Sequence, residues 1–275
     1  MNANKYGFKF NYSSLWHLWQ GSTQFISKRR ITISRDVFLV DVSKWQGGMD
    51  WAKAKSKNLN GAIIKCGQGI AKDPQFDANW TNAKLQSIPR GSYWFWDSRY
   101  PPKTQAYWWW EWIKKDIGEL AHYADYEESY GGQFGGYENF RLFLMEFERL
   151  SNLPARRRGI YTGYYYWIAH SPANLVELSW FTQFPLWLAW YTNNPANVRI
   201  PKPWSDLILW QYGTPAIGYE YGADSREIDA NNFNGDEAAY QAYYGLEPSP
   251  PPQPETQTLR RLILTFTGDY QIREE

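Results

Sequence analysis

Cysteine and histidine are scarce in this chain of 275 residues, and their scarcity excludes several kinds of site. The one cysteine, Cys66, has no second thiol for an intramolecular disulfide or a Cys-based zinc cluster. The three histidines, His17, His122 and His170, are far apart in the sequence, which argues against a His-rich metal centre. We therefore expect no metal and no cofactor.

An excess of charge of one sign is also missing. Lys and Arg total 29 and Asp and Glu total 28, so no overall field attracts nucleic acid or an anionic membrane. No apolar run approaches the roughly 20 residues of a membrane-spanning helix, and the mean hydropathy is −0.63. These features predict neither a nucleic-acid partner nor insertion into a membrane.

Aromatic residues, by contrast, are abundant. They make up 19% of the chain, with 17 Trp and 21 Tyr. So many rings cannot all fit in a core, and a groove lined with Trp and Tyr commonly binds sugar rings or stacked bases. Because the near-neutral charge disfavours bases, a glycan is the favoured ligand.

Charge and proline separate both ends of the chain from its centre. Residues 1–35 carry six basic side chains and no acid, and they lack the apolar core of a secretory signal. They are either a basic arm that is attracted to an anionic envelope or a leader without a role of its own. Residues 246–256 read as a Pro-rich, extended linker, and residues 257–275 are either a truncated module or a strand that docks back. The central domain is predicted over residues 36–245.

Short apolar runs alternate with amphipathic ones in this central domain. The predicted strands are 37–42, 62–66, 91–96, 120–127, 159–162, 186–191, 207–211 and 227–230. The predicted helices are 50–57, 76–86, 103–115 and 137–150. The early strands are each followed by a helix and the last three are not, which predicts an α/β fold with a parallel sheet closed into a TIM-like barrel.

Four acidic residues fall at the ends of predicted strands, where such barrels carry their chemistry. Asp41 ends the first strand, Asp125 and Glu127 end the fourth, and Asp229 lies at the end of the eighth. Asp125 and Glu127 share a face because side chains alternate along a strand, and the first and eighth strands are neighbours in a closed barrel. Crowded carboxylates raise one another's pKa, which suits a general acid. Paired carboxylates without a nucleophile–histidine partner are typical of glycoside hydrolysis.

Five segments in order carry a resemblance to a known family. They read DVSKWQ at 41–46, DYE at 125–127, LWLAWY at 186–191, LWQY at 209–212 and IDANNFNG at 228–235. Together they resemble the family 25 glycoside hydrolases, the Chalaropsis-type lysozymes. The resemblance implies a (β/α)5(β)3 barrel and cleavage of the β-1,4 bond between N-acetylmuramic acid and N-acetylglucosamine in bacterial peptidoglycan.

The same resemblance suggests roles for the acids. Glu127 matches the general acid of the family, Asp125 its second catalytic carboxylate, and Asp41 and Asp229 two supporting acids. The chain departs from the family pattern in the aromatic Tyr126 between the paired acids and in the 40 residues that precede Asp41.

Five aromatic residues match strand positions where the family often carries rings in its substrate cleft. They are Tyr93, Trp94, Trp187, Tyr191 and Trp210. The alternative is that each fills the barrel interior, which also requires large apolar side chains.

Several alternatives stay open at this point. Asp125 either stabilises an oxocarbenium-like centre or orients the 2-acetamido group of the substrate. A chitinase-like glycosidase and a non-catalytic glycan-binding barrel are the rival functions. We expect a monomer that acts at the extracellular bacterial cell wall, released by a phage- or prophage-type route because no export signal is visible.

Overall fold

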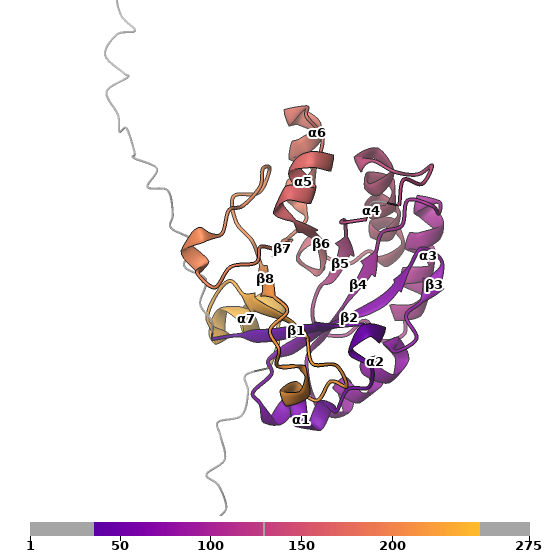
Figure 1. Cartoon of the computed structure of the whole chain (residues 1–275). Coiled ribbons are helices and arrows are strands. Elements are labelled where there is room, and N and C mark those ends of the chain that lie inside the picture. Colours follow the sequence, from indigo (N-terminus) through magenta and orange to yellow (C-terminus); the bar gives the residue numbers. More distant parts are fainter. Residues whose placement is uncertain (1–35, 129, 248–275) are drawn as a thin grey trace, which may run out of the picture.

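The computed structural model describes residues 36–128 and 130–247 (Figure 1). The predicted N-terminal extension at 1–35, the tail at 257–275 and all but the first two residues of the linker at 246–256 lie outside the described residues.

One sheet closes into a barrel, because β1 pairs with β2 as well as with β9. Around the ring the strand order is β1, β2, β4, β5, β6, β7, β8 and β9, and β3 extends β2 as a short hairpin. The strands are β1 Phe38–Val42, β2 Gly61–Gln68, β3 Ala71–Lys72, β4 Arg90–Phe95, β5 His122–Asp125, β6 Arg158–Gly163, β7 Leu186–Ala189, β8 Leu209–Gly213 and β9 Asp229–Phe233. All eight predicted strands are confirmed, with shifted ends.

The helices follow the order that the resemblance implies. They are α1 Trp51–Ser56, α2 Phe76–Leu85, α3 Pro102–Ile113, α4 Tyr137–Ser151, α5 Tyr164–His170, α6 Leu175–Ser179 and α7 Glu237–Tyr244. Each of the first five barrel strands leads into an α-helix, whereas β7 and β8 lead into loops with short 3-10 turns. Figure 1 shows α2, α3 and α4 along the outside of β2, β4 and β5. The (β/α)5(β)3 barrel is thereby confirmed.

The direction of the last strand corrects the expectation of an all-parallel sheet. β9 runs antiparallel to both β8 and β1, whereas the other neighbours around the ring are parallel. Asp229 therefore begins its strand rather than ending it. Because β9 is reversed, its first residue reaches the same end of the barrel as the last residues of the other strands, and Asp229 pairs directly with Asp41.

Side-chain alternation divides the apolar core into two layers. One cluster, including Leu39, Ile63, Tyr123 and Leu209, fills the barrel, and a larger one lies between the strands and the helices. The last residue of β9 lies at the end of the barrel away from the acids, which we call the lower end. Helix α7 follows β9 and crosses this end, so Tyr244 of α7 belongs to the inner cluster. The acids thus lie at the end of the barrel that α7 leaves open.

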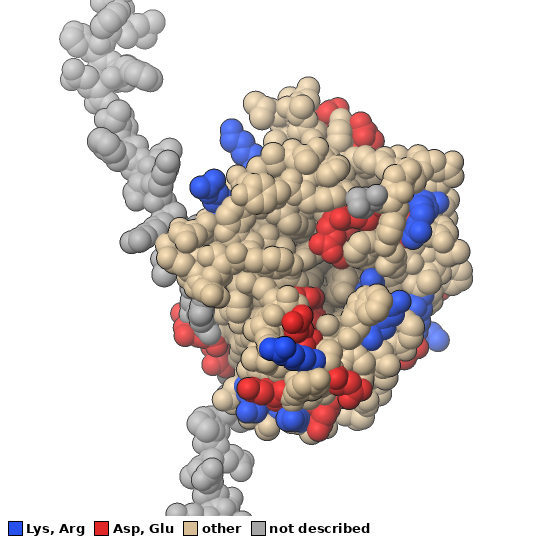
Figure 2. Space-filling model, viewed as in Figure 1, with Lys and Arg blue, Asp and Glu red and all other residues tan. Residues whose placement is uncertain are grey.

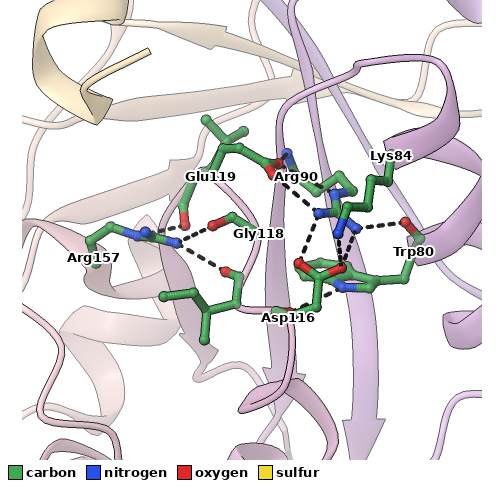
Figure 3. Close-up of polar contacts among 9 residues, drawn as sticks. Trp80, Lys84, Arg90, Asp116, Gly118, Glu119 and Arg157 are labelled. Carbon is green, nitrogen blue, oxygen red and sulfur yellow. Dashed lines mark hydrogen bonds and ion pairs between the residues drawn. The ribbon is translucent and has the colours of Figure 1, made fainter.

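A buried arginine ties the lower end together (Figure 3). Arg90, at the start of β4, has no exposed surface. Its guanidinium donates to Asp116 (3.1 and 3.2 Å), to Glu119 (3.1 and 3.3 Å) and to the carbonyl of Trp80 (2.8 Å). It also lies 4.5 Å from the centre of the Trp80 ring. This network joins α2, β4 and the α3–β5 connection.

Replacing Arg90 with methionine is expected to lower the free energy of unfolding by about 2–3 kcal/mol. Removing one partner of a buried pair costs about 3–5 kcal/mol, but both carboxylates here reach solvent and can hydrate. Urea denaturation measures the change. Lys84→Met is the control, because Lys84 is an exposed partner of the same Asp116 at 3.1 Å and such pairs contribute about 0–1 kcal/mol. Equal midpoints for the two variants would contradict the role of Arg90.

Candidate active site

The four predicted acids meet at the open end of the barrel. Asp41 lies in β1, Asp125 ends β5, Glu127 follows two residues later, and Asp229 opens β9. Their charges interact, since Asp41 raises the pKa of the other three. Figure 2 shows acidic side chains on two sides of a hollow at the centre of this face. The structure therefore brings the four acids together, as the strand positions predicted.

Asp41 is held by two amide side chains from β9 and β8, the next two strands around the ring. Its Oδ2 accepts hydrogen bonds from Asn231 Nδ2 at 2.7 Å and Gln211 Nε2 at 3.0 Å. Burial raises the pKa of Asp41 to about 6, and these hydrogen bonds act in the opposite direction. Asp41 is therefore a fixed carboxyl that changes charge near neutral pH.

Further donors fix the orientation of both amides. The indole Nε1 of Trp187 donates to Asn231 Oδ1 at 2.7 Å, and the Tyr161 hydroxyl donates to Gln211 Oε1 at 2.9 Å. An indole N–H can only donate, so the oxygen of Asn231 must face it and the NH2 group faces Asp41. The sequence reasoning missed Gln211 and Asn231. Both stand inside the motifs at 209–212 and 228–235, and Asn231 lies two residues from Asp229, on the same face.

Asp125 is buried and its pKa is raised well above the usual value. Burial is the main cause and the charge of Glu127 adds to it, whereas Lys65 opposes both. Among the described residues, Asp125 Oδ1 has no hydrogen-bond partner. A buried carboxyl oxygen without a partner is costly, which is typical of a group whose partner is a substrate.

Glu127 reaches solvent at the mouth, while the protein atoms around it remove part of its hydration. This desolvation, followed by the charge of Asp41, raises the pKa of Glu127; a hydrogen bond with Tyr161 and the charge of Lys65 lower it. The net upward shift favours the protonated carboxyl to a higher pH than in an ordinary glutamate. An accessible, protonated carboxyl is what a general acid requires.

Lys65 is a third residue that the sequence reasoning missed. It lies in β2, is 9% exposed, and its Nζ donates to Gln68 Oε1 at 3.2 Å. Burial lowers the pKa of Lys65, and the charges of Asp125 and Asp73 raise it. Its position two residues after Ile63, which faces the barrel interior, is the signal that could have found it.

Two of the five predicted cleft aromatics do not face the cleft. Trp94 and Trp210 have no exposed surface and lie in the layer between the strands and the outer elements. Trp94 packs 5.3 Å from Trp112 of α3, and Trp210 Nε1 donates to the carbonyl of Trp190 at 2.8 Å. Alternation explains the error, because the adjacent residues face inward and each tryptophan must face outward.

The other three lie on the inner side of the barrel wall. Trp187 is 1% exposed and packs 4.4 Å from Tyr161, so it supports the floor of the mouth. Tyr93 is half-buried and meets Trp187 edge-on at 6.1 Å. Tyr191 is 69% exposed, and its hydroxyl donates to Gln211 at 3.4 Å. Of the predicted set, Tyr191 is the ring best placed to meet a glycan.

An exposed tryptophan that was not singled out follows β1 at the open end of the barrel. This residue, Trp45, is 73% exposed. The Nζ of Lys44 lies over its indole, 4.7 Å from the centre of the ring. Exposure of so large a ring is unusual for a folded protein. Its place in the motif at 41–46 was the available signal.

Clusters of metal ligands and membrane-spanning helices are both absent from the described residues. Over 36–128 and 130–247, no group of three or more His, Cys, Asp or Glu side chains is arranged to hold a metal ion. No helix in these ranges is long and apolar enough to cross a bilayer.

The burial of Asp229 predicts a stability that falls as pH rises. Its pKa is about 8 in the folded protein, because of burial and the charges of Asp41 and Glu127, against 3.8 for an ordinary aspartate. Between these values the folded state binds the proton that the unfolded state has lost, so ionisation destabilises the fold. We expect Asp229→Asn to gain about 1–2 kcal/mol at pH 8 and nothing at pH 4.

Thermal melting at both pH values tests this expectation. Glu220→Gln, which removes an exposed carboxylate outside the cluster, is the control and should behave alike at the two pH values. An equal gain for Asp229→Asn at pH 4 and pH 8 would show that packing, rather than charge, is responsible.

Comparison with known proteins agrees with this geometry. The family model described as glycosyl hydrolases family 25 matches residues 40–217. Lysozyme M1 of Streptomyces globisporus is 30% identical over 217 residues, which cover 72% of this chain and 68% of that protein.

Solved structures share the fold. The lysozyme of Streptomyces coelicolor is 24% identical, with a TM-score of 0.62, over 76% of this chain and 96% of the other. A family 25 glycosyl hydrolase of Bacillus anthracis is 22% identical, with a TM-score of 0.60, over 76% and 94%. The match over most of the barrel, with the acids at its mouth, shows that this chain belongs to family 25 of the glycosyl hydrolases.

Proposed function

We propose that this protein is a peptidoglycan hydrolase of the lysozyme type, an N-acetylmuramidase that cleaves the β-1,4 bond after N-acetylmuramic acid. The observation that carries the proposal is the set of four carboxyls with raised pKa values at the mouth of a family 25 barrel. The similarity of this chain to lysozyme M1 supports peptidoglycan as the substrate.

Glu127 is the proton donor in this proposal. Its raised pKa lets the carboxyl hold its proton to a higher pH than an ordinary glutamate does, and its accessible position lets it reach the glycosidic oxygen. The proton moves to that oxygen as the C–O bond breaks, and the leaving sugar departs as an alcohol.

Asp125 acts on the positive charge that develops at the anomeric carbon. Its unpartnered Oδ1 is free to face either the oxocarbenium-like centre or the N–H of the 2-acetamido group, and both routes spread the charge. Lys65 lies close enough to favour the ionised form of Asp125. Asp41 tunes the field, since it raises the pKa of Glu127 and of Asp229. Asp229 adds its charge beside the cluster, where it raises the pKa of Tyr191.

Exposed rings on the rim supply the contact surface for the glycan. Tyr191 and Trp45 are the exposed candidates near the acids. Aromatic faces pack against the C–H faces of sugars, so we place successive sugars of the strand along these rings.

Release of reducing ends from purified peptidoglycan, compared with chitin, tests the function. Product from peptidoglycan and little from chitin is expected. Product from chitin alone would favour a chitinase-like activity instead, and binding to either glycan without product would favour a glycan-binding barrel.

The cell wall is accordingly the proposed place of action. The monomeric state and the phage-type release that the sequence suggested stay predictions.

A further inference from the structure

A basic pocket opens at the same end of the barrel as the acids. Its volume is about 270 Å³, and it is enclosed by the loop after β1, the β2–β3 hairpin and the loop after β4. Four cationic side chains line it: Lys44, Lys65, Lys72 and Arg99. Figure 2 shows basic groups on this face beside the acidic hollow.

Two of these cations are already neutralised. Arg99 makes a two-point ion pair with Asp97, with N–O distances of 2.6 and 2.8 Å. Lys72 pairs with Asp77, outside the pocket lining.

The other two, Lys44 and Lys65, make no close ion pair among the described residues. Within the part of the chain that the structure describes, neither Lys44 nor Lys65 has a carboxylate within 4.0 Å of its Nζ. Asp73, the second acid of the lining, accepts the backbone N–H of Lys44 at 3.2 Å and that of Gln75 at 2.9 Å. The pocket therefore has more positive charge than its own acids balance.

The basic pocket is continuous with the site of bond cleavage. Lys65 belongs to its lining and also lies near Asp125 and Glu127, whose charges act on it. Gln68, another lining residue, donates to the hydroxyl of Tyr130 at 2.9 Å, three residues after Glu127. A group bound here would belong to the same substrate molecule as the bond being cleaved.

We propose that the basic pocket binds a carboxylate carried on the lactyl arm of a muramic acid residue, and so selects peptidoglycan over neutral glycans. This rests on the proposed function. That arm presents either its own carboxylate or those of the attached stem peptide. Ile70, which is exposed, and Pro74 give the pocket an apolar wall for the small side chains of such a peptide. Chitin has no anionic group to offer.

The test compares Lys44→Glu with the wild type on matched glycan fragments. Lys44 is exposed, so the change leaves the core intact. Four substrates are used: fragments with free stem carboxylates, the same fragments with these carboxylates amidated, glycan stripped to its lactyl carboxylate, and chitin oligosaccharides. Lys115→Glu is the control, because it makes the same charge change away from the pocket. Lys115 follows α3 and directly precedes Asp116, which lies at the lower end of the barrel.

Lys44→Glu is expected to raise KM roughly tenfold on the stem-bearing fragments, which corresponds to about 1.4 kcal/mol, with kcat little changed. The lactyl carboxylate is free only in the stripped glycan, so a rise there as well would show that the pocket also accepts that carboxylate, and its absence there would assign the stem peptide. On amidated fragments and on chitin, KM should change no more in Lys44→Glu than it does in Lys115→Glu. An equal loss on amidated fragments, or no loss on any fragment, would overturn the proposal.

Calorimetric binding of the same fragments separates this proposal from the proposed function. If the wild type cleaves none of the substrates, the muramidase assignment fails. A tenfold weaker binding of stem-bearing fragments to Lys44→Glu would then still support the pocket, and unchanged binding would reject it.

Discussion

Replacing Glu127 with glutamine is expected to lower turnover on peptidoglycan by about 10²–10⁴-fold, the usual contribution of general acid catalysis. Glutamine keeps the size and the hydrogen-bonding capacity of the side chain but has no proton to give. Glu127 lies at the mouth and outside the apolar core, so folding and glycan binding should persist. Initial rates of reducing-end release, with binding measured in parallel, give both quantities.

The pH profile adds a readout that a purely structural role would not move. The pKa of Glu127 is raised, mainly by the loss of hydration next to the surrounding protein atoms and then by Asp41, so wild-type activity should extend above the pH at which an ordinary glutamate loses its proton. It should then fall as pH rises through that higher pKa. The residual activity of Glu127→Gln should lack this fall.

Glu138→Gln is the matched control for this substitution. Glu138 is an exposed carboxylate in the first turn of α4, in the same region of the chain. Its loss should change turnover by less than about twofold. Near-normal turnover in Glu127→Gln would place the acid elsewhere, with Asp41 or Asp229 next to be tested.

Replacing Asp125 with asparagine is expected to lower turnover by about 10²–10³-fold, a typical loss when one preorganised electrostatic partner of the transition state is removed. Asp125 is buried, it lies beside Lys65, and its Oδ1 is without a partner among the described residues. An amide has no negative charge with which to stabilise the developing cation. Steady-state kinetics should show the loss in kcat, with KM little changed.

A melting experiment distinguishes this effect from damage to the fold. Burial raises the pKa of Asp125 well above its usual value, so ionisation of Asp125 destabilises the folded state near neutral pH. The melting temperature of Asp125→Asn at pH 7 should therefore not fall below that of the wild type. A variant that melts much lower, or one that retains more than a tenth of the turnover, would remove Asp125 from its proposed role.

Local patterns in the sequence determined the strands, four of the helices and the positions of the acids. Each depends on residues close together in the chain, such as the stripe of apolar residues along α4 or the triplet at 125–127. Short-range periodicity is set by backbone geometry, so it can be read without knowing what packs against it. Helices α5, α6 and α7 were missed, and their 7, 5 and 8 residues give only a weak periodic pattern.

Tertiary structure alone decided which side chains the acids meet. Asp41 is bound by residues 170 and 190 positions away, and no local pattern specifies those contacts. The reversal of β9 likewise depends on its pairing with β8 and β1. The face of each strand residue is set by the register of the closed ring, in which a shift by one residue exchanges inside for outside. For that reason the sequence pattern predicted that Trp94 and Trp210 belong to strands. Only the closed barrel shows that both side chains face away from the cleft.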